Sequence, residues 1–500
     1  MVKQKKILQS IGAQEKRVVV IDKNGKIEEF LLERNNDNLA GNIYKGKITH
    51  VVKGMDAAFV DIGRGKNGFL YVNELIPCVD AYSIEVDEHS TKKTENLPFK
   101  GKKDIGKLLR KGQEIMVQVV KEPFGTKGCR LTSQISLPGR FLVLMPYNKS
   151  IGISKKIKNK KERVRLRSLL QELKLPQSMG CIIRTQAENK GKREFAREIK
   201  YLLRLLQEIK QQGLKSTAPC LLHQEYGLVL RTARDLFTDD IEQFIVDDRD
   251  AYKQAVNFIK ILAPELKSRL VLHKEKISLF EKYDVNVQIE NIFLRKVTLE
   301  NGGYIVIEKT EALVSVDVNS GSFIDTSKLE QTALITNLEA AKEVARQIKL
   351  RDLAGIIIVD FIDMQKIVNQ KKVLQVLYKF LENDRARINI YPFSPLGLVQ
   401  IARQRIRKSV ENIMFMKCPH CQGKGMIKTI QTIAIKVLRR LKYFLLTHKQ
   451  RSVEITVHPL IAMRLLNEER AEIITLEKKM WRKIAIFADE HLDLEEIKFL

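Results

Sequence analysis

Hydrophobic and polar residues alternate with the period of β-strands over most of the first 135 positions. Two alternating runs flank an Asn-Gly turn in VVVIDKNGKIEEFLLE, residues 18–33, which predicts a hairpin. Short β-type runs separated by glycines follow over residues 41–75 and resume at residues 111–137, so this region predicts a small barrel. The polar, lysine-rich stretch at 78–103 interrupts the pattern, and we expect it to be a mobile insertion.

The pattern becomes mixed after residue 140. FLVLM (141–145) and GCIIRT (180–185) are typical of strands, and the segment 193–212 predicts a basic helix. From about 285 to 395 the order is strand, strand, helix, strand, helix, strand, which indicates a layered α/β domain. We expect a basic helix at 398–415, then the motif KCPHCQGKG and a small α/β tail. The predicted fold class is therefore a multidomain α/β and β protein.

Length and charge narrow the choice of function. A chain of 500 residues exceeds what one hydrophobic core usually supports, so several domains are expected. Lys and Arg outnumber Asp and Glu by 88 to 60, a formal net charge of +28, which favours a polyanionic partner, either nucleic acid or an anionic membrane surface. No apolar run is long enough for a membrane span, and the first residues lack the pattern of a secretory signal. The scattered cysteines indicate a reducing compartment.

Two predicted strands, ALVSVDVNS (312–320) and GIIIVDFIDM (355–364), each carry an aspartate near the end of an apolar run, where burial would be costly. A helix of about twenty residues separates them, so the strands should be parallel and place Asp317 and Asp360 at the same edge of a sheet. Asn319 should point to the same side as Asp317, and the second strand should be buried on both faces. Paired carboxylates repel unless a divalent cation such as Mg²⁺ neutralises them. The alternative is that each aspartate is an ordinary turn or cap residue.

Cys418 and Cys421 have the spacing of a zinc knuckle, in which a tight turn followed by glycines lets two thiolates bind one ion. A tetrahedral site needs four ligands, and the chain has no second pair of this kind. A second copy of the protein could supply the missing half, which would make zinc a link between two chains. The alternative is a redox or merely structural cysteine pair.

Two further groups of residues suit nucleic acid. In the barrel, Phe59 and Phe69 occur among Lys45, Lys47, Arg64 and Lys66. In this arrangement bases could stack on the aromatic rings while phosphates pair with the cations. The alternative is that both phenylalanines belong to the core. Arg184 and Thr185 follow a strand, where a guanidinium and a hydroxyl could hold a phosphate, although an arginine in that place is often simply exposed.

These stretches together resemble the ribonuclease E/G family of endoribonucleases. The resemblance rests on GNIYKGKITHVV, AAFVDIG, GFLYVNEL, CIIRT, EALVSVDVNSG, TNLEAAKEVARQIKLRDLAGIIIVDFIDM, DRARI and CPHCQGKG, in this order. It implies that Asp317 and Asp360 bind Mg²⁺ and that Asn319 orients the site. It also implies a 5′-monophosphate pocket at Arg184 and Thr185, RNA contacts from Phe59 and Phe69, and one zinc shared by Cys418 and Cys421 of two chains, with tetramers built from such dimers.

The resemblance further implies an S1-type RNA-binding barrel inserted near the start of a split RNase H-like domain, followed by a DNase I-like catalytic domain. The expected domains are 1–36 and 216–282 for the two RNase H-like parts, 37–135 for the barrel, 136–215 for the 5′-phosphate sensor, 283–400 for the catalytic domain, 401–428 for a basic helix and zinc link, and 429–500 for a small C-terminal domain.

The resulting hypothesis is a Mg²⁺-dependent endoribonuclease that cuts single-stranded, A/U-rich RNA, favours a 5′-monophosphate, and acts in RNA processing and mRNA decay. Two rivals stay open: an RNA-binding scaffold without catalysis, and a zinc-linked nuclease that acts on DNA. The abundance of Lys and Ile, the lack of a transit peptide and the lack of a long scaffold tail favour a plastid-encoded protein of the plastid stroma, with a bacterial cytoplasm as the alternative.

Overall fold

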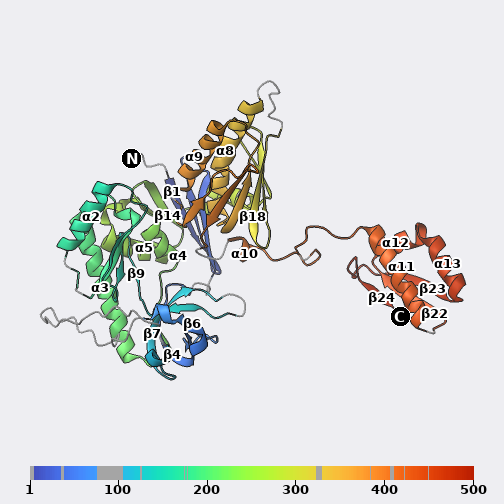
Figure 1. Ribbon diagram of the computed structural model, residues 1–500, viewed down its shortest axis with the longest axis horizontal. Helices are drawn as coiled ribbons and strands as arrows, with labels where there is room; N and C mark the ends of the chain where they lie inside the picture. The colour runs from blue at the N-terminus through green and yellow to red at the C-terminus, as the bar shows by residue number, and fades with distance from the viewer. Residues whose placement is uncertain are drawn as a thin grey trace. The chain divides into compact units, whose positions relative to one another are not determined.

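In a computed structural model the chain divides into two compact units, residues 1–410 and 411–500. The structure describes residues 5–34, 39–75, 105–123, 127–173, 175–176, 178–321, 329–382, 384–405, 410–421, 423–448 and 450–499. The insertion expected at 78–103 lies outside the described residues. The chain is a multidomain α/β protein that contains a closed five-stranded barrel (Figure 1).

The first sheet joins the beginning of the chain to a segment more than 200 residues later. Its strands run in the order β15-β14-β1-β2-β3, with bounds Lys5–Ile11 (β1), Glu15–Ile21 (β2), Ile27–Arg34 (β3), Ile241–Val246 (β14) and Leu270–Leu272 (β15). The antiparallel pairing of β2 with β3 confirms the predicted hairpin. The helices α4 (Leu228–Asp235) and α5 (Arg249–Leu262) pack on one face, and α6 (Leu279–Lys282) and α7 (Val285–Asn291) pack on the other.

The barrel closes because its first strand pairs with two partners. Its strands are β4 (Ile43–Val52), β5 (Ala57–Asp61), β6 (Gly68–Tyr71), β8 (Arg130–Thr132) and β7 (Glu114–Lys121), and β7 returns to β4. Alternate residues such as Ile48, Val60 and Leu70 fill its interior. The short helix α1 (Ile105–Leu108) and the strand β13 (Cys220–His223), which pairs with β4, lie against it.

A four-stranded sheet follows the barrel in the order β11-β12-β10-β9. The strands are β9 (Leu137–Pro138), β10 (Leu142–Met145), β11 (Ile151–Ile153) and β12 (Gly180–Ile183). The predicted basic helix is α3 (Lys192–Lys215), and a further helix, α2 (Lys160–Glu172), was not predicted. Apolar residues of both helices and of the sheet form one core.

The sheet that carries the two aspartates has six strands in the order β16-β17-β18-β19-β21-β20. The bounds are Lys296–Thr298 (β16), Tyr304–Lys309 (β17), Leu313–Asn319 (β18), Gly355–Asp360 (β19), Leu398–Arg403 (β21) and Ile388–Ile390 (β20). The helices α8 (Leu329–Leu350) and α9 (Ile367–Leu381) lie side by side against one face (Figure 1). The other face remains open among the described residues of this sheet, with Ser315, Asp317 and Ile356 half-buried or exposed.

The basic helix expected at 398–415 is wrong for its first part, because Leu398–Arg403 forms strand β21 antiparallel to β19. Val399, Ile401 and Arg403 alternate into the buried layer, which is the period of a strand. Only Val410–Met414 forms a short helix, α10, and residues 406–409 lie outside the described part.

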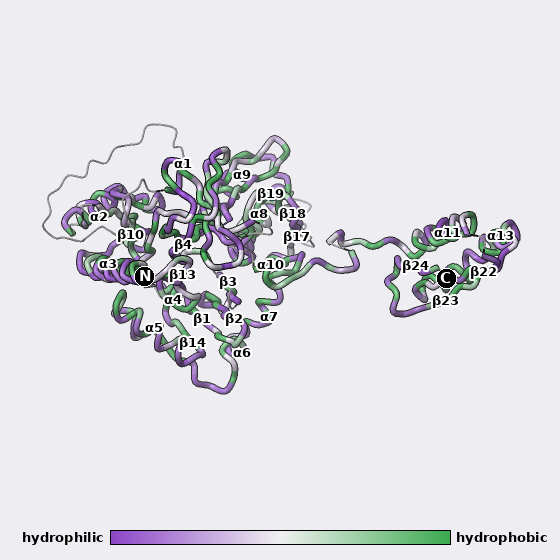
Figure 2. The backbone as a smooth tube through the Cα atoms, turned by 90° about the horizontal axis from the view of Figure 1, so that it is seen from below, coloured by the Kyte–Doolittle hydropathy of each residue, from purple (hydrophilic) through white to green (hydrophobic). Residues whose placement is uncertain are grey.

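Residues 411–500 contain a small α/β domain. Its elements are α11 (Ile430–Thr447), β22 (Ser452–Val457), α12 (Pro459–Asn467), α13 (Arg470–Met480), β23 (Lys483–Ala488) and β24 (Ile497–Phe499), with strand order β23-β22-β24. Hydrophobic and hydrophilic residues interleave along α11 and α13, as amphipathic helices require (Figure 2). Across the described part of the chain, no helix is both long and apolar enough to cross a membrane.

Candidate active site

Asp317 and Asp360 lie next to each other at the carboxyl ends of two parallel strands. They are register partners, Asp317 on β18 and Asp360 on β19, which confirms the predicted parallel pairing. Both side chains are exposed on the sheet face that α8 and α9 leave uncovered, while Val316 and Val359 point into the core beneath them. The apolar runs suggested that the two carboxylates would be buried at a cost in energy. That expectation is wrong, because the alternation of each strand turns its carboxylate to solvent.

The apolar sequence of the second strand, β19, predicted burial on both faces. This prediction is wrong. Ile357 and Val359 are buried against the helices, but Ile356 on the opposite face is 54% exposed. Gln400 and Leu398 of β21 lie opposite Ile358 and Asp360 on this open face. Ile356 and Ile358 therefore form an apolar surface on the open face beside the two carboxylates, while Ile357 faces the helices.

No Lys or Arg side chain in the described part of the chain neutralises the charges at this edge. Partial burial, followed by the negative charges of Asp317 and Asp363, raises the pKa of Asp360 above its usual value. Within the described ranges, Asp317, Asp360 and Asp363 form no ion pair with a Lys or Arg side chain. Two hard oxygen donors with uncompensated charge are the ligands that Mg²⁺ prefers. The donor set therefore fits a divalent cation.

Two asparagines position this edge. Asn319 extends from the same face as Asp317, and its Nδ2 donates to Asp317 Oδ2 at 2.8 Å. Asn337, fully buried on α8, donates to the carbonyl of Ile362 at 2.7 Å and accepts from the amide of Ile362 at 3.0 Å. This pair of hydrogen bonds fixes the backbone just after Asp360. Sequence reasoning missed Asn337, although an asparagine on the buried face of a helix is a signal for such a role.

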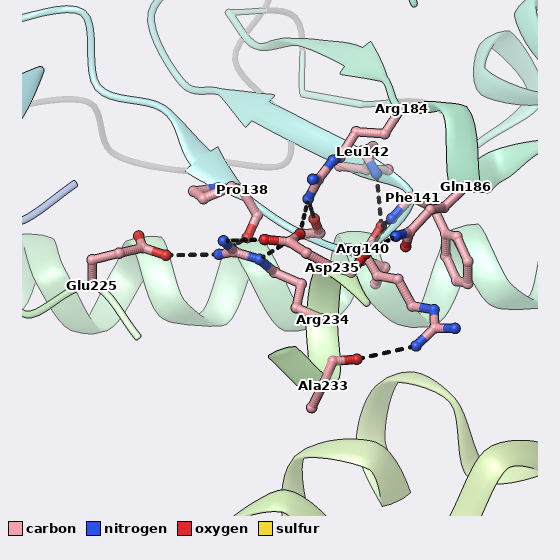
Figure 3. A network of polar contacts seen from close by, with 12 residues as sticks. Pro138, Arg140, Phe141, Leu142, Arg184, Gln186, Glu225, Ala233, Arg234 and Asp235 are labelled. Atoms are coloured by element: carbon pink, nitrogen blue, oxygen red, sulfur yellow. Dashed lines mark hydrogen bonds and ion pairs between the residues drawn. The ribbon is translucent and has the colours of Figure 1, made fainter. Parts of the chain in front are cut away.

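Arg184 lies at the end of β12 within a polar network (Figure 3). Its Nη1 donates to the carbonyl of Gly139 and is 2.8 Å from Asp235 Oδ1. Burial raises the pKa of Asp235, but the charges of Arg234 and Arg184 outweigh this and hold it below its usual value. Thr185 is exposed, and its hydroxyl is 3.2 Å from that of Ser154. Arg184 is therefore held in place by a carboxylate, with Thr185 open beside it.

A buried carboxylate supports the same network from behind. Glu198 of α3 is 1% exposed, and the amides of Arg140, Phe141 and Leu142 donate to it. Burial raises the pKa of Glu198 to about 7, while the three amides and the charge of Arg184 act in the opposite direction. Glu198 thus fixes the backbone that carries the carbonyl partner of Arg184. This role of Glu198 could not be predicted from the sequence, because glutamates on a basic helix are usually exposed.

Phe59 and Phe69 lie outside the barrel core. They are register partners on β5 and β6, half-buried, with ring centroids 5.4 Å apart. Tyr71, which sequence reasoning missed, continues the row, with its ring 4.4 Å from that of Phe69. Lys45 does not belong to this surface, because its Nζ is buried against Glu114 and the carbonyl of Ser216. The core alternative is therefore wrong for both phenylalanines.

Cys418 and Cys421 lie in the exposed segment at the start of the second unit. Amide hydrogen bonds from Gly425 and Gly423, together with a hydrogen bond from Cys418, lower the pKa of the Cys421 thiol. The described residues contain no group of three or more His, Cys, Asp or Glu side chains that could hold a metal. His420 points toward Asp493, with Nδ1 at 3.7 Å from Oδ1. A metal at this pair would therefore need ligands from elsewhere.

Comparison with known proteins identifies the chain. The sequence model of the Ribonuclease E/G family matches residues 136–406, and that of the RNase E/G thioredoxin-like domain matches residues 417–499. Ribonuclease G of Escherichia coli (strain K12) is 35% identical over 481 residues, 96% of each chain. Ribonuclease G of Haemophilus influenzae is 35% identical over 494 residues, 98% of each chain. Ribonuclease E of E. coli (strain K12) is 35% identical over 475 residues, 95% of this chain and 43% of that protein. The chain belongs to the Ribonuclease E/G family.

Proposed function

We propose that this endoribonuclease cuts single-stranded, A/U-rich RNA with the help of Mg²⁺ and favours substrates with a 5′-monophosphate. The observation that carries the proposal is the pairing of Asp317 with Asp360 in register on an open sheet face, where no Lys or Arg side chain of the described residues forms an ion pair with them. The same site would have no purpose in the rival, an RNA-binding scaffold without catalysis. Cleavage by the wild-type protein distinguishes the two.

The reaction is the hydrolysis of a phosphodiester. A water oxygen bonds to phosphorus, the bond from phosphorus to O3′ breaks, and O3′ leaves as a hydroxyl, so the products carry a 5′-phosphate and a 3′-hydroxyl. A Mg²⁺ ion held by Asp317 and Asp360 would supply charge neutralisation at the scissile phosphate. Asn319 fixes the orientation of the Asp317 carboxylate, and Asn337 fixes the backbone after Asp360. These two asparagines therefore fix the positions of the two carboxylates before RNA binds.

The proposed binding site for the 5′-monophosphate consists of Arg184 and Thr185. The proposed RNA-binding residues of the barrel are Phe59 and Phe69. The side chain of Arg184 is 28% exposed and its guanidinium is oriented by Asp235, so it can offer its remaining N–H groups to a phosphate. The paired rings of Phe59 and Phe69 offer surfaces on which bases can stack.

The function is tested by the rate of cleavage of one A/U-rich RNA prepared with either a 5′-monophosphate or a 5′-hydroxyl. Wild type with Mg²⁺ should prefer the monophosphate roughly 10- to 100-fold, the worth of a charge-assisted hydrogen bond. Arg184→Gln and Thr185→Ala should lose most of the preference and keep the rate on the 5′-hydroxyl RNA, which serves as the internal control for folding. Equal rates on both RNAs by wild type would refute the pocket. Absence of any cleavage would favour the scaffold, and equal cleavage of single-stranded DNA would favour the DNA-acting rival.

The domain assignment is also a proposal. We assign the sheet of β1–β3 with β14 and β15 to a split RNase H-like domain, the barrel to an S1-type domain, and the six-stranded sheet with α8 and α9 to a DNase I-like catalytic domain. The joining of residues 5–34 with residues 241–272 in one sheet supports the split. Strand β21 crosses the boundary expected at residue 400, so the catalytic domain is better ended after Arg403.

We further propose that Cys418 and Cys421 share one zinc ion with the same pair of a second chain, giving a homodimer and, from two dimers, a tetramer. Elemental analysis should find one zinc per two chains, and Cys418→Ser with Cys421→Ser should lose both the zinc and the dimer. Cys220→Ser, at another free cysteine, is the control. One zinc per chain, or dimers that survive the double substitution, would refute the shared site.

The location of the protein stays a prediction that rests on its composition. The predicted location is the plastid stroma, with a bacterial cytoplasm as the alternative.

A further inference from the structure

The single tryptophan of the chain is almost fully exposed. Trp481 follows the last residue of α13 and is 92% exposed. Its backbone is left-handed, with φ of 53°, and its amide donates to the carbonyl of Glu477, so the C-cap of the helix holds the indole outward. A left-handed conformation is uncommon for a bulky residue, and exposure of an indole forgoes its large hydrophobic gain. Neither packing nor local conformation explains tryptophan at this position.

Cationic residues occupy the positions next to Trp481 along the chain and on the neighbouring backbone. Lys478 and Lys479 form the last turn of α13, Lys483 begins β23, and the amide of Lys483 donates to the carbonyl of Arg451 at 3.2 Å. All four side chains are exposed, and none forms an ion pair with another described residue. We call Arg451, Lys478, Lys479, Trp481 and Lys483 the Trp481 patch.

The neighbouring charged groups are already engaged. Arg482 donates from Nη1 to the carbonyls of Leu445 and His448, which anchors this end of α13 to the end of α11. Glu477 accepts the amide of Ile484 at Oε1, 2.9 Å away. Glu477, Lys478 and Lys483 also line a hollow of about 570 Å³ beside the patch. The free charge of this surface is therefore positive.

We infer that the Trp481 patch is a second contact for single-stranded RNA, in which a base stacks on the indole and neighbouring phosphates lie against the lysines and Arg451. The inference rests on the proposed function only in taking RNA as the ligand. An aromatic face among unpaired cations is the arrangement that binds single strands without sequence preference. Membrane-surface binding needs a contiguous apolar face, whereas four of the six residues at 478–483 are cationic and only Met480 and Trp481 are apolar.

Intrinsic fluorescence tests this directly, because every photon of tryptophan emission comes from Trp481. Oligouridylate of twelve nucleotides with a 5′-hydroxyl, added to the full chain without Mg²⁺, should quench the emission in a saturable manner. Trp481→Ala should weaken binding of this RNA, measured by anisotropy of a labelled oligomer, roughly 5- to 100-fold, while Trp481→Phe should keep most of the affinity. Replacing Lys478, Lys479 and Lys483 with Gln should lower the slope of log affinity against log salt by about 2.

Phe487→Ala is the matched control, since Phe487 is an exposed aromatic residue of β23 outside the patch and should leave the affinity unchanged. Unchanged emission on addition of RNA, or equal affinity of wild type and Trp481→Ala, would overturn the inference. A blue shift with phosphatidylglycerol vesicles but no response to RNA would also overturn it, in favour of a membrane contact. Quenching is independent of cleavage, so a protein that shows quenching but does not cut RNA would refute the proposed function and leave this inference standing.

Discussion

Asp317→Asn is expected to slow RNA cleavage by roughly 10³-fold and to leave RNA binding intact. If Asp317 and Asp360 hold Mg²⁺ as proposed, loss of one carboxylate should remove several kcal/mol of stabilisation from the charged transition state, and each 1.36 kcal/mol is a factor of ten in rate. Asparagine keeps the size of the side chain, and Asp317 is exposed, so the fold should not change. The rate is measured in a single turnover with Mg²⁺ on 5′-monophosphorylated RNA, and binding by anisotropy.

Asp363→Asn is the matched control for this substitution. Asp363 lies three residues after Asp360, and its charge raises the pKa of Asp360, but it follows the strand rather than ending it. It should change the rate less than tenfold. A loss at Asp363 as large as at Asp317, or a normal rate for Asp317→Asn, would mean that the reaction takes place elsewhere.

The largest effect on stability is expected from Arg403→Met. The side chain of Arg403 is 5% exposed, with Nη1 at 2.7 Å from Asp352 Oδ1 and Nε at 3.0 Å from Asp384 Oδ2. The two carboxylates are 5% and 2% exposed, so removal of the guanidinium takes away the cation that both of these buried charges contact. The cost of breaking such a group is about 3–5 kcal/mol.

Urea unfolding followed by circular dichroism measures this loss. Arg405→Met, two residues beyond and exposed, is the control and should change the free energy of unfolding by less than about 0.5 kcal/mol. If Arg403→Met is as stable as wild type, the buried network does not hold β21 in place. Addition of Asp384→Asn to Arg403→Met should recover part of the loss, because it removes one of the two buried negative charges.

The network also explains why β21 was mistaken for a helix. IARQRIRKS has four cations in nine residues, and a run of this kind usually forms a solvent-exposed face, which favoured a basic helix. Arg403 is instead buried, because Asp384 and Asp352, 19 and 51 residues away along the chain, supply its counter-charges. Local patterning cannot reveal partners at such separations. The paired aspartates could be predicted, because parallel strands and their alternation follow from local sequence and the length of the connecting helix.

In the other candidate sites, too, some residues could be predicted from the sequence, whereas the contacts that hold them could not. Phe59 and Phe69 were identifiable as possible base-stacking residues, but only their register shows that both rings leave the barrel core, with Tyr71 beside them. Arg184 could be located after its strand, whereas its fixation by Asp235 and the support from Glu198 depend on contacts between distant elements. Residue type and spacing thus identify candidate substrate-binding groups, and tertiary contacts determine how these groups are held.

A double-mutant cycle on the cleavage rate tests most directly whether Asp317 and Asp360 act as one unit. The rate constants of wild type, Asp317→Asn, Asp360→Asn and the double variant are measured in a single turnover on the same 5′-monophosphorylated RNA with Mg²⁺. If both carboxylates hold one ion, each single substitution removes most of the rate and the double variant loses little more. Losses that multiply, or a single variant that cuts as fast as wild type, would contradict a shared metal site at the ends of β18 and β19.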